Sequence, residues 1–167
     1  MTSAEGTRLS QTVRQKMEEV IKLCEGLDEK TASRAPEGRW SPRQILSHLC
    51  GPEGVGYMAT VQAMLQQDTP RLDIEAENPF FTEKRSRMTV AELLAELKTE
   101  YGRMADVVAG LSEEQRARKG HIPLLKETPI GEYPTVGMWI QAIAEYHIKF
   151  HIDHMKEILT TLLTTQG

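Results

Sequence analysis

The chain has 167 residues, of which 40% are hydrophobic and 26% are charged, and this composition fits one globular domain over residues 1–167 with a sizeable core. The formal net charge is −4, and lysine and arginine are scattered among acidic residues, so there is no basic face for a phosphate backbone and nucleic-acid binding is disfavoured. No stretch approaches the roughly 18 uninterrupted apolar residues of a membrane span, and residues 1–6 lack the features of a signal peptide, which favours a cytoplasmic protein without membrane attachment.

Apolar residues that recur every three or four positions predict a first helix over residues 7–23. Gly26 is typical of the residue that follows a helix, so we expect the first helix to stop there. Further along, Ser41 and Pro42 form the pair expected at an N-cap and a first helical position. These signals predict a second helix over residues 42–67.

The pair Gly51-Pro52 interrupts this second helix. Proline has no backbone N–H, so Pro52 cannot donate a hydrogen bond to the carbonyl of His48, and we expect the helix to kink or split there. Residues 68–88 then read as a long surface crossover. A basic cluster in the crossover is expected to be solvated, with attraction of an anionic substrate as the alternative: Lys84, Arg85 and Arg87.

The second half of the chain predicts two further helices. Thr89 and Glu92 form a capping box that opens a third helix over residues 90–109. After a Pro- and Gly-containing loop, Thr135 is the expected N-cap of a last helix that reaches about Thr164. The predicted fold is therefore all-α, with four long helices packed as one bundle.

Three histidines lie on one face of the last helix. Spacings of four and three residues rotate the rings of His151 and His154 by about +40° and −20° relative to that of His147. The same stripe contains aliphatic residues: Ile140, Ile143, Ala144 and Ile158. Buried imidazoles need partners, and neutral imidazole is the commonest metal ligand, so the stripe favours a divalent metal site. Structural histidines held by hydrogen bonds remain the alternative.

One helix supplies too few ligands for most metal sites, because an i, i+4 pair contributes only two. His48 is the candidate from elsewhere, since it lies among apolar residues at helical spacing in the second helix, and bundles build metal sites between facing helices. The remaining candidate, His121, follows Gly120 in a loop and is left out of the ligand set.

These residues resemble those of a known family. Two parts of the sequence carry the resemblance: the run from Trp40 to Leu49, which contains His48, and the pair His147 and His151. Together they are similar to the DinB and YfiT-like superfamily of metal-binding four-helix bundles. The resemblance covers nearly the whole chain. It implies an up-down-down-up bundle with a long crossover between the second and third helices, and a divalent-metal triad formed by His48, His147 and His151.

Two positions depart from the pattern of that family. Members often have Gln three residues after the last ligand, where this sequence has His154, and an acidic residue after the helix-two histidine, near which this sequence has Glu53. We expect His154 or Glu53 to assist proton transfer, with a shift of one turn that makes His154 a ligand as the alternative.

Three imidazoles leave coordination positions open, where an ion can bind and ionise water or a thiol. The resemblance implies homodimers and thiol-dependent transferases that use low-molecular-weight thiols such as bacillithiol or mycothiol. We therefore expect zinc, nickel or iron in an enzyme that transfers such a thiol to a small-molecule electrophile. Metal-dependent hydrolysis and a non-catalytic metal-binding or stress-response bundle are the alternatives, and the sequence does not decide whether the protein is catalytic.

Overall fold

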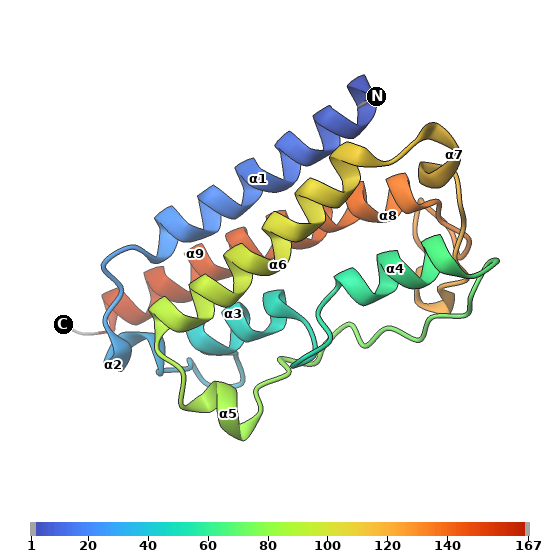
Figure 1. Ribbon diagram of the computed structural model, residues 1–167. Coiled ribbons are helices and arrows are strands. Elements are labelled where there is room, and N and C mark those ends of the chain that lie inside the picture. The colour runs from blue at the N-terminus through green and yellow to red at the C-terminus, as the bar shows by residue number, and fades with distance from the viewer. Residues whose placement is uncertain (1–2, 166–167) are drawn as a thin grey trace.

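The computed structural model describes residues 3–165, in which four long helical segments form a bundle (Figure 1). The prediction of one domain over residues 1–167 stays a prediction, because Met1, Thr2, Gln166 and Gly167 lie outside the described residues. The bundle segments are α1 (Ala4–Cys24), α3 (Pro42–Cys50) with α4 (Met58–Gln66), α6 (Val90–Gly110), and α8 (Val136–Ala142) with η2 (Ile143–Ile148) and α9 (Lys149–Thr164).

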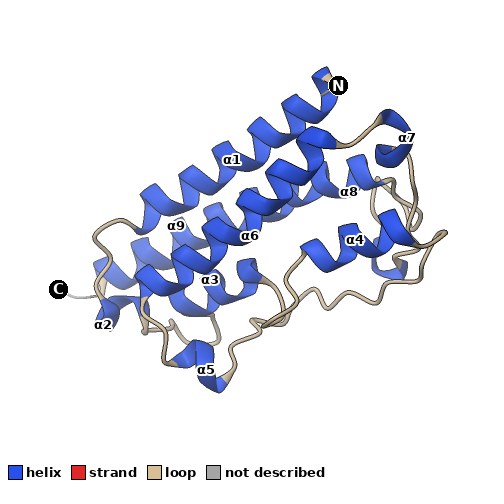
Figure 2. Cartoon of the chain, viewed as in Figure 1, coloured by secondary structure: helices blue, strands red, loops and turns tan. Residues whose placement is uncertain are grey.

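The directions of the four segments follow the expected up-down-down-up order. In Figure 1, α1 and the last segment run one way, while α3–α4 and α6 run the opposite way. Because the second and third segments are parallel, residues 67–89 must return along the bundle before α6 begins. Figure 2 shows that this crossover is mostly loop, with one short helix, α5 (Glu83–Ser86).

The predicted break in the second helix is confirmed. Helix α3 ends at Cys50, the next residue, Gly51, has a positive φ of 74°, and α4 begins only at Met58. Ser41 is the N-cap of α3 and Pro42 its first residue, as expected, and Gln44 completes a capping box with Ser41. The break divides one predicted helix into two short ones, so that the end of α3 lies inside the protein.

The last helix differs from the prediction of one regular α-helix. Between α8 and α9, residues Ile143–Ile148 form a π-helix, which the apolar stripe did not indicate. The stripe itself is confirmed, since it faces the core: Ile140, Ile143, Ala144, His151 and Ile158 are buried. A π-turn holds more residues than an α-turn, and such turns occur often at functional sites.

The core of the bundle is formed by apolar side chains from all four segments. Cys24 and Cys50 are buried free thiols within it, and burial raises the pKa of each thiol to about 12. Both are therefore packed, unreactive groups. Among residues 3–165, no helix has the length and apolarity needed to cross a bilayer.

The expectation of a solvated basic cluster is wrong for Arg85, which is 1% exposed. Its guanidinium bonds to Glu96 at 2.8 Å and to backbone carbonyls of α3 and the following turn. Lys84 and Arg87 keep exposed side chains. Burial of Arg85 is possible because the end of α3 leaves carbonyl groups that need a donor.

The packing of α1 on α6 yields a prediction about two glycines. A Cβ on Gly6 would lie 2.8 Å from the carbonyl oxygen of Val108, whereas a Cβ on Gly102 would meet nothing within 4 Å. We expect Gly6→Ala to lower the free energy of unfolding by about 1–3 kcal/mol, because the two helices must move apart. Gly102→Ala should raise it by about 0.5–1 kcal/mol, because alanine favours the helix. Urea unfolding measures both, and equal midpoints would contradict the close contact.

Candidate metal centre

The last turn of α3 carries His48 and ends in the protein interior. A helix leaves its final carbonyls without partners inside the helix, and buried carbonyls need donors. Here side chains from other elements supply them: Arg85 Nη1 to Ser47 O at 3.0 Å, Tyr57 Oη to His48 O at 2.8 Å, and Tyr101 Oη to Leu49 O at 2.8 Å. The hydroxyl of Tyr57 thus replaces the N–H that Pro52 lacks, and the turn that holds His48 is fixed from three sides.

The ring of His48 is oriented by the crossover. Its Nδ1 lies 2.6 Å from the carbonyl oxygen of Asn78. A carbonyl can only accept a hydrogen bond, so Nδ1 carries the proton, and in the neutral ring Nε2 holds a free lone pair. That Nε2 lies 2.9 Å from Nε2 of His147. An N–H to carbonyl bond on the far side of the ring is the usual way in which a metal-ligating histidine is held.

His147 and His151 approach His48 from the last helical segment. His147 lies in the π-helix η2 and His151 in the first turn of α9. Ring centroids are 5.0 Å apart for His48 and His147, 4.5 Å for His48 and His151, and 4.9 Å for His147 and His151. One nitrogen from each ring lies within 4.8 Å of the others. The three predicted ligands therefore converge.

This donor set fits a divalent transition-metal ion. Two nitrogens bound at about 2.1 Å to one ion, at angles of about 90–110°, lie about 3.0–3.4 Å apart, close to the 2.9 Å between His48 and His147. Because Nε2 of His48 presents a lone pair, Nε2 of His147 either donates a hydrogen bond to it or presents a second lone pair that a shared cation can bridge. Three imidazoles suit zinc, nickel, copper or iron, so the donors do not define the element.

Burial keeps the three rings neutral. Burial, together with a smaller effect of the neighbouring imidazoles, lowers the pKa of His147 to about 4 and that of His151 to about 2. Burial also lowers the pKa of His48, although the hydrogen bond to the Asn78 carbonyl partly offsets this effect. Metal ligation requires neutral imidazole, so the site is held in the state that binds an ion at neutral pH.

His154 lies next to the group without belonging to it. Its Nδ1 is 3.4 Å from Nδ1 of His151, and its ring lies 6.1 Å from that of Trp40. Trp40 stacks parallel to His151, with an interplanar angle of 7°. These rings, with His147, line a small cavity of about 430 Å³. Arg39 and Glu77 are charged residues of the same lining. His154 is therefore placed beside the triad and not in it.

Glu53 and His121 lie elsewhere. The carboxylate of Glu53 accepts a hydrogen bond from Thr82 at 2.5 Å and lies 4.0 Å from Lys84. Within residues 3–165, the histidine group does not include Glu53, and neither cavity beside the group has Glu53 in its lining. His121 stacks on Tyr133 in the loop before α8, which agrees with leaving it out of the ligand set.

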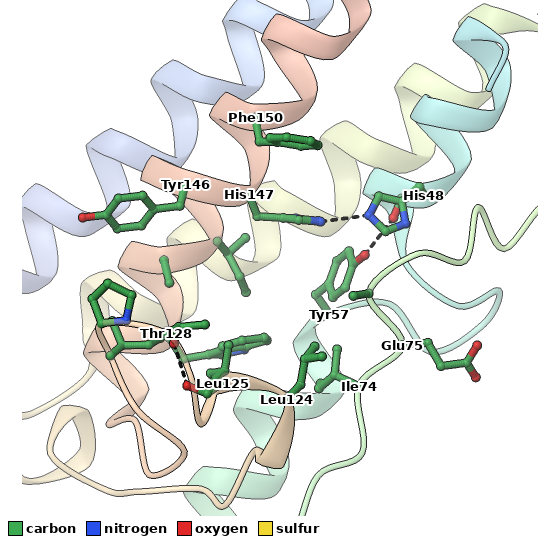
Figure 3. A pocket seen from close by; sticks show the side chains of 16 residues that line it. His48, Tyr57, Ile74, Glu75, Leu124, Leu125, Thr128, Tyr146, His147 and Phe150 are labelled. Carbon is green, nitrogen blue, oxygen red and sulfur yellow. Dashed lines mark hydrogen bonds between the residues drawn. The ribbon is translucent and has the colours of Figure 1, made fainter. Parts of the chain in front are cut away.

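A larger cavity of about 590 Å³ adjoins the triad on another side (Figure 3). His48 and His147 form one part of its wall, and the remaining wall comes from Tyr57 before α4, the crossover, the loop before α8, and the last helical segment. The crossover and the loop are joined by backbone hydrogen bonds of 2.8 Å, from Leu72 N to His121 O and from His121 N to Pro70 O. Two loops that are distant in the sequence thus close one side of the cavity.

Sequence reasoning missed the residues that orient His48. Asn78 presents its carbonyl to the ring, and its side chain accepts a hydrogen bond from Phe80 N at 2.7 Å. Phe80 has a positive φ of 50° and stacks on His48 with an interplanar angle of 1°. The Asn78-Pro79 pair is a turn signal that marks this segment, but nothing in the sequence indicates which ring the turn contacts.

Fold and site together define a four-helix bundle protein with a histidine group that could hold a metal ion. A family model described as the DinB superfamily matches residues 12–155, and the chain belongs to that superfamily. YfiT from Bacillus subtilis has a similar structure, with a TM-score of 0.74 and 19% sequence identity over 97% of this chain and 90% of that chain. YfiT is described as a probable metal-dependent hydrolase with an unusual four-helix bundle topology. No curated protein matches the sequence.

Removal of a triad histidine should abolish tight metal binding. We expect His48→Ala and His147→Ala each to weaken Zn²⁺ or Ni²⁺ binding by roughly 100-fold or more, because only two imidazole ligands remain. This loss is larger than the loss that follows when a residue that only orients a ligand is changed. His121→Ala is the matched control and should keep its metal, since His121 lies in a separate loop. Titration calorimetry and elemental analysis after chelator-free purification measure this. Unchanged metal content in both triad variants would remove the assignment.

The buried Arg85 should matter far more for stability than its exposed neighbour. Arg85→Met removes the donor to the carbonyls at the end of α3 and leaves Glu96 without its partner, so we expect a loss of about 3–5 kcal/mol in the free energy of unfolding. Arg87→Met is the control and should change it by about 0.5 kcal/mol or less, because the ion pair of Arg87 with Glu83 is exposed. Denaturant unfolding compares them, and similar losses would refute the structural role of Arg85.

Proposed function

We propose that the protein is a divalent-metal-dependent enzyme that transfers a low-molecular-weight thiol onto a small electrophile. In this proposal His48, His147 and His151 hold the ion, and His154 assists proton transfer. The ion, when bound, acts as a Lewis acid that lowers the pKa of the thiol. Zinc, nickel and iron are the candidate ions, because all three accept imidazole ligands.

One observation carries the proposal. Three neutral imidazoles, two buried and that of His147 half-buried, converge, and two of them form part of the wall of a cavity that is large enough for a small molecule. A purely structural ion has no need of an adjoining cavity, because structural sites are closed by protein ligands. A donor set that opens onto a cavity instead supports a site where a reactant reaches the ion.

The two cavities favour a reaction with two reactants. They have His147 in common, and their linings differ in character, since the larger is mostly apolar and the smaller contains Arg39, Glu77 and His154. The thiol S–H gives its proton to His154, and its sulfur forms a bond to the electrophilic carbon. The leaving group departs with the bonding electron pair and takes up a proton. His154 is only half-buried, so that proton can exchange with solvent.

Hydrolysis is the second candidate, in which water replaces the thiol as the second reactant. The description of YfiT as a probable metal-dependent hydrolase favours it, although the two chains share only 19% of their residues. The same triad and the same cavities serve either reaction. Glu53 has no part in either version, because its carboxylate is engaged with Thr82 away from the triad.

Turnover with and without a thiol separates the two reactions. Zn²⁺- or Ni²⁺-loaded protein is incubated with 1-chloro-2,4-dinitrobenzene and a thiol such as bacillithiol, mycothiol or cysteine. We expect conjugate formation at least about tenfold above the uncatalysed rate, because the site would lower the pKa of the thiol and hold both reactants. Product is measured by absorbance.

The controls use the same variants as the metal titration. His147→Ala should abolish conjugation, and His121→Ala should keep it. Ester cleavage in water without any thiol would favour hydrolysis. Metal binding without turnover in either assay, across a broad panel of electrophiles and esters, would favour a non-catalytic metal-binding bundle.

A further inference from the structure

We infer that the larger cavity binds the apolar body of an uncharged small molecule, whose one polar reacting group lies against His48 and His147. This inference rests on the proposed function and names the class of its electrophilic substrate. It is carried by the chemistry of the cavity lining, by the state of the polar groups in that lining, and by the exposed side chains at its edge.

Apart from His48, His147, Glu75 and Thr128, the lining is formed by aliphatic and aromatic residues. Figure 3 shows His48 and His147 facing each other at one end, with Ile74, Leu124 and Leu125 grouped away from them. The other lining residues are largely aliphatic or aromatic: Tyr57, Ala76, Pro129, Ile130, Trp139, Ala142, Ile143, Tyr146 and Phe150 belong to it. Such a surface stabilises a ligand in proportion to the apolar area that the ligand removes from water.

Three polar side chains of the lining are already engaged within the protein, whereas the buried Nε1 of the lining residue Trp139 has no hydrogen-bond partner among the described residues. The hydroxyl of Tyr57 donates to the His48 carbonyl at 2.8 Å, and that of Thr128 donates to the Leu125 carbonyl at 2.7 Å. Glu75 is the only residue with a charged side chain among the described lining residues, and it accepts a hydrogen bond from the Asn78 side chain at 2.7 Å. Figure 3 shows the Glu75 carboxylate directed away from the other labelled lining residues, so a charged ligand body would lose its hydration without an ion-pair partner inside the cavity, which disfavours it on energetic grounds.

The edge of the cavity exposes large apolar side chains. Leu124, Tyr146 and Phe150 are 47%, 68% and 64% exposed, and all three belong to the lining. Exposed apolar groups gathered at a cavity indicate a binding surface more often than isolated ones do. The volume of about 590 Å³ lies within the range of about 300–1,000 Å³ that small-molecule sites occupy. The site thus suits one small molecule, and the reacting group of that molecule is directed by the position of the triad.

A series of straight-chain alkyl hydroxamates tests this inference. The hydroxamate head binds an ion at the triad, and the alkyl chain from acetohydroxamate to octanohydroxamate probes the cavity. On Zn²⁺-loaded protein we expect the dissociation constant to fall about fourfold for each added methylene until the cavity is full. Titration calorimetry measures the affinity, and elemental analysis confirms that Zn²⁺ stays with the protein. Affinity that is independent of chain length would overturn the inference.

Two variants locate the alkyl chain. Ala142→Phe fills the cavity and Ile74→Asp places a charge in it, and both should remove most of the gain from chain length while Zn²⁺ affinity stays unchanged. Ile74 lies in the crossover and not in a helix, and its side chain is only partly buried against the core. Ala117→Phe is the matched control, because Ala117 is exposed and lies outside both linings. An equal gain in all variants would place the chain elsewhere and overturn the inference.

A metal-free measurement separates failure of this inference from failure of the proposed function. The chain has two tryptophans, so Trp40→Phe leaves Trp139, a lining residue, as the fluorescent reporter. Hexan-1-ol should shift its emission, and the added Ala142→Phe change should prevent the shift. If the alcohol binds in this way to a protein that takes up no metal, the cavity assignment stands and the metal-dependent function fails. If Zn²⁺ binds but neither hexan-1-ol nor chain length has an effect, the cavity assignment fails and the metal-dependent function is left standing.

Discussion

The end of α3 inside the protein is the constraint on which the rest of the structure depends. Pro52 stops the helix where water cannot reach its last carbonyls, and each unsatisfied buried carbonyl costs about 1–3 kcal/mol. The donors come from the turn after α3, from α5 and from α6, as Tyr57, Arg85 and Tyr101. These elements are therefore tied to the turn that carries His48. Packing of the crossover and the position of the His48 imidazole therefore depend on each other: Arg85 holds the turn that carries His48, and the Asn78 carbonyl holds its ring.

The facing side of the site shows a comparable local departure from regular structure. A π-helix gives up the regular i to i+4 pattern over Ile143–Ile148, and this segment carries His147 just before the first turn of α9 brings in His151. Both partners of the 2.9 Å nitrogen contact thus lie beside an irregularity, a broken helix on one side and a widened helix on the other. Regular helices would bury the same stripe more simply. The irregularities are placed where the imidazoles converge, which is consistent with a site that the fold accommodates at a structural cost.

Much of the bundle could be predicted because its signals are local. Apolar periodicity, the capping box of Thr89 and the break at Pro52 each act within a few residues, and the histidine stripe together with the family resemblance indicated the triad. The burial of Arg85 could not be predicted, because its neighbours are charged and its acceptors exist only after α3 ends in the core. The direction of Glu53 depends on the positive φ of Gly51, and the role of Asn78 depends on a turn that meets His48 only in three dimensions.

The position of the triad between two unlike cavities has a chemical consequence. An apolar wall lowers the local dielectric, so charges and dipoles at the histidines act more strongly than they would in water. The smaller cavity, with Arg39 and Glu77 in its wall, keeps a polar environment on the other side of the same imidazole, His147. Charge that forms or disappears at the triad therefore does so at the boundary between an apolar cavity and a polar one. Such a boundary would favour the proposed reaction between a polar nucleophile and an apolar electrophile, because each reactant can remain in the surroundings that stabilise it while only the reacting atoms meet.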